Sequence, residues 1–207
     1  MNKPKVLILS SGTKTGGGSG FRKLVEDVLN GVWNVEIVGV VCNRAYIPGA
    51  PDSEQPGVWR IAQELGIGFT PFYKGDSYTE LQKKYYAPWL ISAGWLLPID
   101  GHDASHTINI HPADMNLFGG PGMYGLHLHQ AVLDSGATES AVTIHFVDDE
   151  YDHGSTICKV PFPVLPGDTA ESLQERGKEL EHRIYGRVLE LVINRGMKEI
   201  PSDLLAA

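Results

Sequence analysis

The feature that most constrains the fold of this sequence is an alternation of short apolar runs with segments of helical periodicity. Apolar runs occupy residues 6–9, 35–42 and 89–93, with a shorter run at 67–70, and the run at 35–42 is rich in β-branched residues. Between them, residues 21–29 place apolar side chains at helical spacing, and 59–65 and 81–86 are compatible with short helices. Strands that alternate with helices in this way form open, mostly parallel sheets, whose buried strands lack polar alternation. The first half therefore predicts a Rossmann-like α/β fold.

The second half has a different pattern. A strand over 107–111 is cut short by Pro112, and a glycine-rich loop and a helix over 126–133 follow. Residues 141–147 and 156–164 alternate like strands and are joined by an acidic loop, and a long helix from about 169 to 195 carries one apolar face. No repeat or low-complexity linker interrupts the chain. We predict a single domain over residues 1–207, with halves of about 1–100 and 101–207.

Composition excludes several classes of partner. The formal net charge of -8 argues against nucleic acid and anionic membranes, since both require a basic patch. The apolar run at the start is too short for a signal peptide, and no stretch reaches membrane-spanning length. Cys42 and Cys158 both lie in apolar runs, which predicts two buried thiols rather than a disulfide. We expect a cytoplasmic protein.

A glycine-rich loop, GGGSG at 16–20, separates the first expected strand from the first expected helix. Backbone N–H groups at such a junction hold anions, so the loop predicts a phosphate site. It is not a Walker loop, because no Lys-Ser or Lys-Thr follows, and the third glycine of a dinucleotide fingerprint would fall at Phe21. The alternative is a flexible loop without a ligand.

A second candidate site begins with Asn109 and His111, which are two residues apart on a predicted strand and so project from one face. Open α/β sheets bind ligands where their strands end, as this one does at Pro112. A later loop contains Asp148, Asp149, Glu150 and Asp152. A carboxylate from that loop would raise the basicity of an imidazole beside it. The alternatives are a structural histidine and a solvated acidic turn.

A metal centre is a further alternative, because the chain has eight histidines. The candidate ligands are His127, His129 and His145. Two histidines at this spacing diverge on a helix, and no HExxH or paired-cysteine spacing appears. We expect no metal, and we expect His145 to anchor the acidic loop.

Taken in order, the glycine loop, INIHPA with FGGPGMYGLHLHQAVL, TIHFVDDEYDHGSTI and the late ELEHRIYG resemble the phosphoribosylglycinamide formyltransferase family of folate-dependent enzymes. The resemblance runs nearly end to end. It implies the formyltransferase fold and transfer of a formyl group from 10-formyltetrahydrofolate, a co-substrate, to the amine of 5-phosphoribosylglycinamide in purine synthesis. It implies small-molecule substrates and a monomer or homodimer.

The resemblance also implies roles for particular residues. Asn109 and His111 would stabilise the tetrahedral intermediate, with His111 as general acid, and Asp152 would hold His111 protonated and assist proton transfer. Glycinamide ribonucleotide would be bound by Gly18, Ser19, Gly20 and Glu181. The folate would contact Leu96, Leu97, Pro98, Ile99, Asn109, Val147 and Asp149. Because the side chains of 96–99 are apolar, we expect this segment to use backbone groups.

Three departures from the family pattern concern substrate contacts. Gly20 stands where Asn is common, Leu97 where Arg is common, and Asp114, Met115 and Asn116 where the family often has Leu-Leu-Pro. The reaction type is therefore firmer than the identity of the amine. The alternatives are a formyltransferase for another amine, such as an amino-sugar nucleotide, and a non-catalytic phosphometabolite-binding protein. From the residues alone, Glu181 reads as a solvated helical carboxylate.

Overall fold

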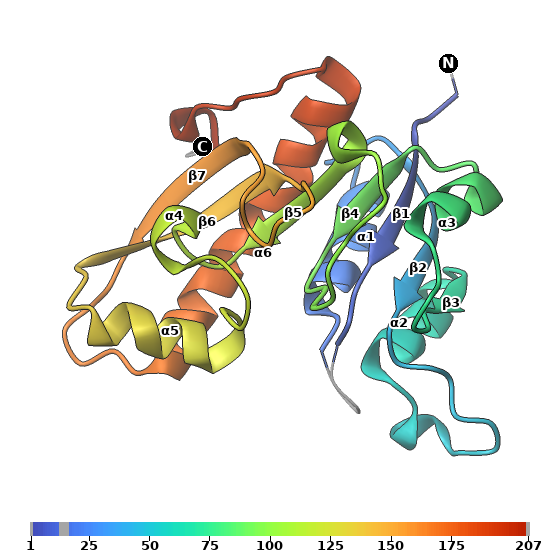
Figure 1. Ribbon diagram of the computed structural model, residues 1–207, viewed down its shortest axis with the longest axis horizontal. Coiled ribbons are helices and arrows are strands. Elements are labelled where there is room, and N and C mark those ends of the chain that lie inside the picture. The colour runs from blue at the N-terminus through green and yellow to red at the C-terminus, as the bar shows by residue number, and fades with distance from the viewer. Residues whose placement is uncertain (1, 13–16, 206–207) are drawn as a thin grey trace. The chain divides into compact units, whose positions relative to one another are not determined.

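The structure, a computed structural model, describes residues 2–12 and 17–205 (Figure 1). Its backbone contacts divide the chain into two compact units, Met1–Ile108 and Asn109–Ala207, which we call the N-terminal and C-terminal units.

Within its described residues, the N-terminal unit is a parallel sheet with three α-helices. Its strands follow the order β3-β2-β1-β4-β5, and each neighbouring pair is parallel. The strands are β1 (Lys5–Leu9), β2 (Glu36–Cys42), β3 (Phe69–Pro71), β4 (Trp89–Ser92) and the first residues of β5 (Thr107–His111). The helices are α1 (Ser19–Leu29), α2 (Gly57–Leu65) and α3 (Tyr78–Tyr85), with 3-10 turns at Asp52–Glu54 and Ala104–His106. Every element expected in this half is present.

Boundaries shift where local hydrogen bonds decide them. Helix α3 begins at Tyr78 rather than at residue 81, because the Ser77 hydroxyl accepts a hydrogen bond from the Glu80 N–H and caps the helix. Strand β3 covers 69–71 rather than 67–70, since only Phe69, Thr70 and Pro71 pair with β2.

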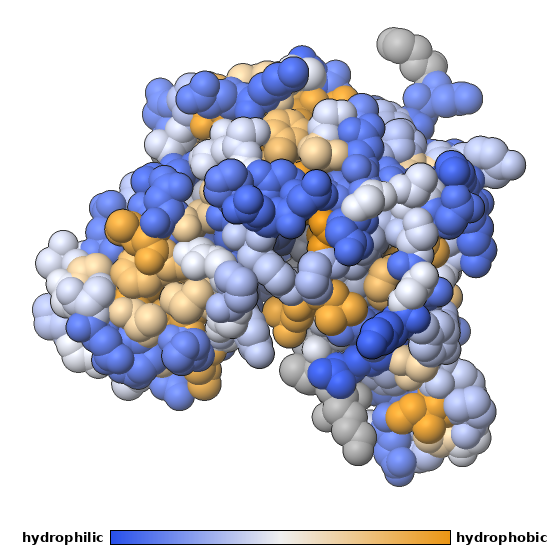
Figure 2. Space-filling model, viewed as in Figure 1, coloured by the Kyte–Doolittle hydropathy of each residue, from blue (hydrophilic) through white to orange (hydrophobic). Residues whose placement is uncertain are grey.

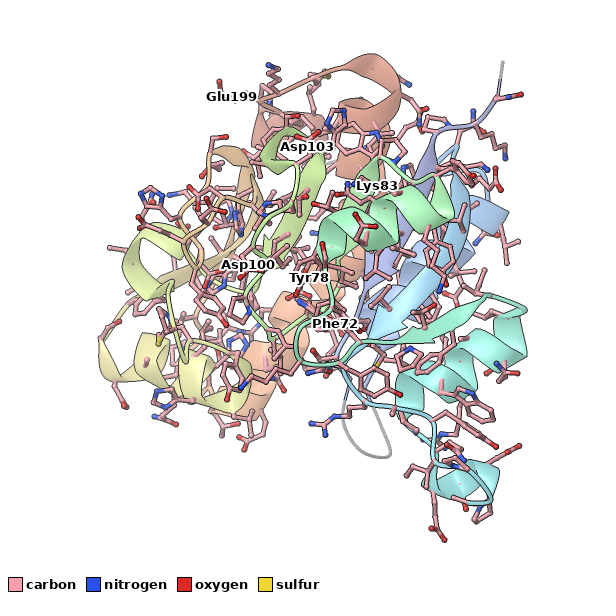
Figure 3. The ribbon with its side chains drawn as sticks, turned by 45° about the vertical axis from the view of Figure 1, so that its right-hand side comes forward. Phe72, Tyr78, Lys83, Asp100, Asp103 and Glu199 are labelled. Atoms are coloured by element: carbon pink, nitrogen blue, oxygen red, sulfur yellow. The ribbon has the colours of Figure 1, made fainter. Side chains whose placement is uncertain are left out.

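One face of this sheet carries an aromatic core that supports the chain after β4. Alternate residues of β1 point into it, and it includes Leu7, Leu9, Val41, Phe72, Tyr78, Leu81, Ala87, Leu90 and Trp95. Phe72 and Tyr78, labelled in Figure 3, stack with ring centroids 4.8 Å apart. Trp95 meets Phe72 edge-on at 5.4 Å, a favoured aromatic geometry.

The C-terminal unit contains the end of β5 and an antiparallel pair, β6 (Glu139–Phe146) and β7 (Thr156–Pro163), in the order β5-β6-β7. Its helices are α4 (Met115–Phe118), α5 (Gly125–Asp134) and α6 (Ala170–Arg195), with a 3-10 turn at Ser202–Leu205. Helix α6 packs against α5 and β6. Gly177 lets α6 approach β7, because an added Cβ would lie 3.2 Å from the Phe162 ring.

Helix α4 was not expected; no element was assigned to residues 113–117, and the predicted glycine-rich loop begins at Phe118. Asp114 caps it by accepting a hydrogen bond from the Asn116 N–H at 3.1 Å. Asp114 also pairs with Lys159 of β7 at 3.0 Å. The Asp-Met-Asn departure therefore forms a capped turn of helix directly after the β5 motif.

These elements confirm the expected α/β class with a mostly parallel sheet of seven strands. Cys42 and Cys158 are both free and buried, as predicted. Within the described residues, no helix is long and apolar enough to cross a membrane. On the face drawn in Figure 2, hydrophilic residues predominate and hydrophobic ones form separate small patches.

Candidate active site

The side chains at the end of β5 form a hydrogen-bonded group with the strand and loop that follow in the C-terminal unit. We call Asn109, His111, His145 and Asp152 the histidine cluster. His111 and His145 are 3% and 1% exposed. Buried polar groups of this kind require partners, and each member has one inside the cluster or on the backbone around it.

His111 has an acceptor at both ring nitrogens. Its Nε2 lies 2.9 Å from the Phe118 carbonyl oxygen, and its Nδ1 lies 3.4 Å from Asp152 Oδ2. A neutral imidazole can donate to only one of these acceptors, whereas the imidazolium can donate to both. The arrangement therefore gives an imidazolium at this position a carbonyl on one side and a carboxylate on the other.

Asp152 occupies a strained backbone conformation that the surrounding loop enforces. Its φ is +50°, in the left-handed region that residues other than glycine rarely adopt. Its Oδ2 accepts a hydrogen bond from the Gly120 N–H at 3.0 Å. At Gly119 an added Cβ would lie 2.3 Å from the Met115 carbonyl oxygen and 3.0 Å from Asp152 Cβ. Two glycines of the FGG sequence thus hold the carboxylate beside His111.

Asn109 is oriented by His145. The His145 Nδ1 lies 2.8 Å from the Phe146 carbonyl oxygen, so it carries the proton and donates. The unprotonated Nε2 then accepts from the Asn109 amide nitrogen at 3.1 Å. Burial lowers the pKa of His145, which keeps the ring neutral and its lone pair available. One N–H of the Asn109 amide is therefore bonded to His145, and this bond also fixes the direction of the second N–H.

Sequence reasoning gave His145 only the role of a loop anchor or a metal ligand, and it did not identify Thr143. The Thr143 hydroxyl donates to the Ala113 carbonyl at 2.7 Å and accepts from the Met115 N–H at 3.3 Å. The available signal was the alternation of Thr143 and His145 on one strand, which places both side chains on the same face.

Two expected folate residues lie on the acidic loop. Val147 is buried, while Asp149 is exposed. Their neighbour Asp148 accepts from the Glu150 N–H and pairs with His153 at 2.8 Å. Part of the loop is thus the solvated acidic turn that we considered, while Asp152 belongs to the histidine cluster.

Glu181 is not the solvated helical carboxylate that the residues alone favoured. Burial on α6 raises its pKa to about 7, with Lys178 one turn away opposing the shift. Tyr185 lies one turn further along and is buried; burial and then the charge of Glu181 raise its pKa. A half-buried carboxyl group that titrates near neutrality is an unusual feature of a helix, and such groups gather at functional sites.

The described part of the glycine loop lies in the N-terminal unit, and Gly16 falls outside the described residues. Gly18 precedes α1 with φ +83°, and no side chain among the residues that the structure describes caps the helix. Its first-turn N–H groups are therefore suited to an anion. An added Cβ at Gly18 would lie 2.9 Å from Ile61, whereas at Gly20 it would make an ordinary 3.6 Å contact with Ala93. Ser19 is exposed.

The expected folate segment, 96–99, also belongs to the N-terminal unit. Leu96 is 42% exposed, while Leu97 and Ile99 pack against the aromatic core. The Leu96 N–H donates to the Ser11 hydroxyl at 3.0 Å, and the Pro98 carbonyl accepts from the Tyr78 hydroxyl at 2.7 Å. Two of the backbone groups considered for a ligand are thus already bonded within the protein.

The histidines considered as metal ligands do not converge. His127 is exposed, His129 is buried, and His145 is bonded to Asn109. In residues 2–12 and 17–205, no three His, Cys, Asp or Glu side chains group as a metal site. Burial, and secondarily His111 and Lys178, lower the pKa of His129 to about 4, so its ring is neutral at physiological pH.

Comparison with known proteins places the chain in a class. The formyl transferase family matches residues 5–189, which include parts of both units. The chain belongs to the formyl transferase family.

The chain is similar to proteins that are named more specifically within this family. The chain is 34% identical over 193 residues to a chloroplastic phosphoribosylglycinamide formyltransferase of Arabidopsis thaliana, covering 89% of this chain and 65% of that protein. It therefore spans slightly less than two thirds of the plant protein. The crystal structure of phosphoribosylglycinamide formyltransferase from Brucella melitensis is 26% identical, with a TM-score of 0.71 and coverage of 100% of this chain and 97% of that one.

A crystal structure of glycinamide ribonucleotide transformylase 1 from Symbiobacterium toebii is 23% identical, with a TM-score of 0.78, and covers 93% of this chain and 89% of that one. This likeness establishes the fold. The predicted formyltransferase fold is confirmed.

Proposed function

We propose that this protein transfers the formyl group of 10-formyltetrahydrofolate to the amine of 5-phosphoribosylglycinamide, giving the N-formyl product and tetrahydrofolate. Family membership and the names of the relatives support the proposal. The observation that carries it is the histidine cluster. It offers a fixed amide donor, an imidazole and a carboxylate, the three groups needed to stabilise an oxyanion and move a proton.

The chemistry follows from the cluster. The amine nitrogen attacks the formyl carbon, and the carbonyl electron pair moves to the oxygen. The second N–H of Asn109 and a protonated His111 donate to that oxygen; for His111 this exchanges its bond to the Phe118 carbonyl for one to substrate. The bond between the formyl carbon and the folate nitrogen then breaks. His111 supplies the proton to the departing nitrogen, and Asp152 with water receives the proton lost by the amine.

Binding roles are assigned residue by residue. Gly18, Ser19 and Gly20 would hold the ribosyl phosphate through the uncapped start of α1. Glu181 would bind the glycinamide amine, a role suited to a carboxyl group that titrates near neutrality. Leu96, Leu97, Pro98 and Ile99, with Asn109, Val147 and Asp149, would contact the folate. We propose that residues 1–207 act as one formyltransferase domain. Cytoplasmic location and a monomeric or homodimeric state remain predictions.

The test is formyl transfer by the purified protein with each amine in turn. We expect turnover with 5-phosphoribosylglycinamide and none with an amino-sugar nucleotide. Turnover only with the amino sugar would support the second formyltransferase hypothesis. Binding of the ribonucleotide without any transfer would support a non-catalytic protein, and would leave the histidine cluster without the proposed task.

A further inference from the structure

Two serines directly after β1 are almost completely buried. Ser10 and Ser11 are 0% and 1% exposed. Their backbone N–H groups donate to the carbonyl oxygens of Val41 and Gly94, both at 3.0 Å. These bonds tie the end of β1 to the ends of β2 and β4, its neighbours in the parallel sheet.

The two hydroxyl groups bind different backbone groups. Ser10 Oγ donates to the Ala93 carbonyl at 2.8 Å. Ser11 Oγ reaches further along the chain and accepts the Leu96 N–H at 3.0 Å. The Ser11 carbonyl in turn accepts from the Cys42 thiol at 3.4 Å, and burial raises the pKa of that thiol, which keeps it a donor. The N–H, the carbonyl and the hydroxyl of Ser11 are therefore all hydrogen-bonded, and the hydroxyl is the acceptor for the first residue of 96–99.

Tyr78 holds the other part of this segment. Its hydroxyl donates to the Pro98 carbonyl at 2.7 Å and accepts from Trp95 Nε1 at 3.1 Å. Tyr78 is buried in the aromatic core on α3, and Figure 3 labels it together with Asp100, the residue that follows the segment. Leu97 lies between the two attachment points.

We propose that Ser11 and Tyr78 are positioning residues that fix the backbone of 96–99 for the pterin ring of the folate. This rests on the proposed function. Because the Ser11 hydroxyl is buried, its loss leaves the Leu96 N–H without its acceptor, and water is poorly placed to substitute. The side chains of 96–99 are apolar, so polar recognition by this segment depends on backbone groups held in a set geometry. Neither residue touches the reacting atoms.

The experiment compares matched pairs of substitutions. Ser11→Ala and Tyr78→Phe should each raise the KM for 10-formyltetrahydrofolate about tenfold, the effect of one misplaced hydrogen-bonding group. The KM for the amine and kcat should stay within about twofold. Ser10→Ala removes an equally buried hydroxyl that does not reach Leu96, and Tyr85→Phe removes one on the same helix that bonds Thr70. Both controls should keep the wild-type KM for the folate.

A second measurement needs neither substrate nor activity. In hydrogen exchange, the Leu96 amide should lose its protection in Ser11→Ala and keep it in Ser10→Ala. Loss of protection with an unchanged folate KM would overturn the positioning role while leaving the proposed function intact. Equal effects of Ser10→Ala and Ser11→Ala on the folate KM would show that both hydroxyl groups act only by stabilising the fold, which would overturn the positioning role of Ser11. An inactive wild type that binds no folate would instead overturn the proposed function.

Discussion

The histidine cluster differs in its polar groups from the two proposed substrate segments of the N-terminal unit, which are the glycine loop and residues 96–99. The cluster consists of buried polar side chains that are bonded to one another and to carbonyl groups. The glycine loop and 96–99 instead have small or apolar side chains, and apart from the Ser19 hydroxyl their polar groups belong to the backbone. Substitution in the cluster should therefore change turnover, whereas substitution in the segments should change affinity.

The largest expected effect tests the first half of that contrast. Asp152→Asn keeps the shape of the side chain but removes the negative charge that faces His111 Nδ1. We expect kcat to fall by about 10² to 10³, with the KM of each substrate within about twofold. Steady-state kinetics measure both constants.

The matched control is Glu150→Gln, an exposed carboxylate of the same loop, which should leave kcat unchanged. Near-normal turnover of Asp152→Asn would make Asp152 part of a solvated turn. The proton would then have to leave through water or another carboxylate of the loop.

The second prediction asks whether His145 acts through Asn109. Its neutral ring offers a lone pair to the Asn109 amide, and His145→Phe removes that acceptor while keeping a planar ring. We expect kcat to fall by about tenfold or more, since one donor to the oxyanion loses its orientation. If Asn109→Ala reduces kcat no further in the His145→Phe background, the two residues act as one unit. Fully additive losses would separate them.

The sequence predicts the sheet and several residues of the histidine cluster, but it does not predict every element. The parallel sheet followed from apolar runs at 6–9, 35–42 and 89–93, because burial on both faces leaves a simple signature. Asn109 and His111 were candidates because chemistry-bearing side chains stood at a strand end, whereas Asp152 was one of four carboxylates in the acidic loop and only the family resemblance singled it out. Helix α4 was missed, since a single capped turn of four residues is too short for periodicity to detect.

Long-range hydrogen bonds could not be predicted. Ser11 and Leu96 are separated by 85 residues, and nothing in the sequence of either marks the contact. The pairing of Asn109 with His145 depends on tautomer and register, which periodicity does not encode. The raised pKa of Glu181 required knowledge of its burial, since the same residue on an exposed helix face would be ordinary.

The third prediction tests the second half of the contrast. Ser19→Ala removes one hydroxyl from the start of α1, and we expect the KM for 5-phosphoribosylglycinamide to rise about fivefold with kcat unchanged. Gly20→Asn introduces the residue that the family resemblance implies there, and its Cβ would make an ordinary 3.6 Å contact with Ala93. This variant should bind the ribonucleotide at least as tightly as wild type. Changes confined to the folate KM would reverse the assignment of the two segments.

Gly18 is unsuitable for that test, although it belongs to the same loop. Its φ of +83° means that any larger side chain strains the backbone, and an added Cβ would also lie 2.9 Å from the end of the Ile61 side chain, which would have to move. A Gly18 variant should lose stability and affinity together, which thermal unfolding beside kinetics would show.

The smallest expected effect concerns Glu181, which combines features of both regions, since it is a half-buried side chain with an assigned binding role. Burial raises its pKa from 4.5 to about 7, so the folded state binds more protons than the unfolded state between these values. Its contribution to stability is therefore complete below pH 4.5 and is lost as pH rises through 7. Relative to Glu181→Gln, the wild-type free energy of unfolding should decline by on the order of 2 kcal/mol over that window, less than full burial would give because the group keeps part of its hydration.

Urea unfolding at pH 5 and pH 8 measures the difference, with Glu179→Gln, exposed on the same helix, as control. A decline of equal size in both variants and the wild type would show that Glu181 is as hydrated as any surface carboxylate, and would remove the physical support for its role at the amine.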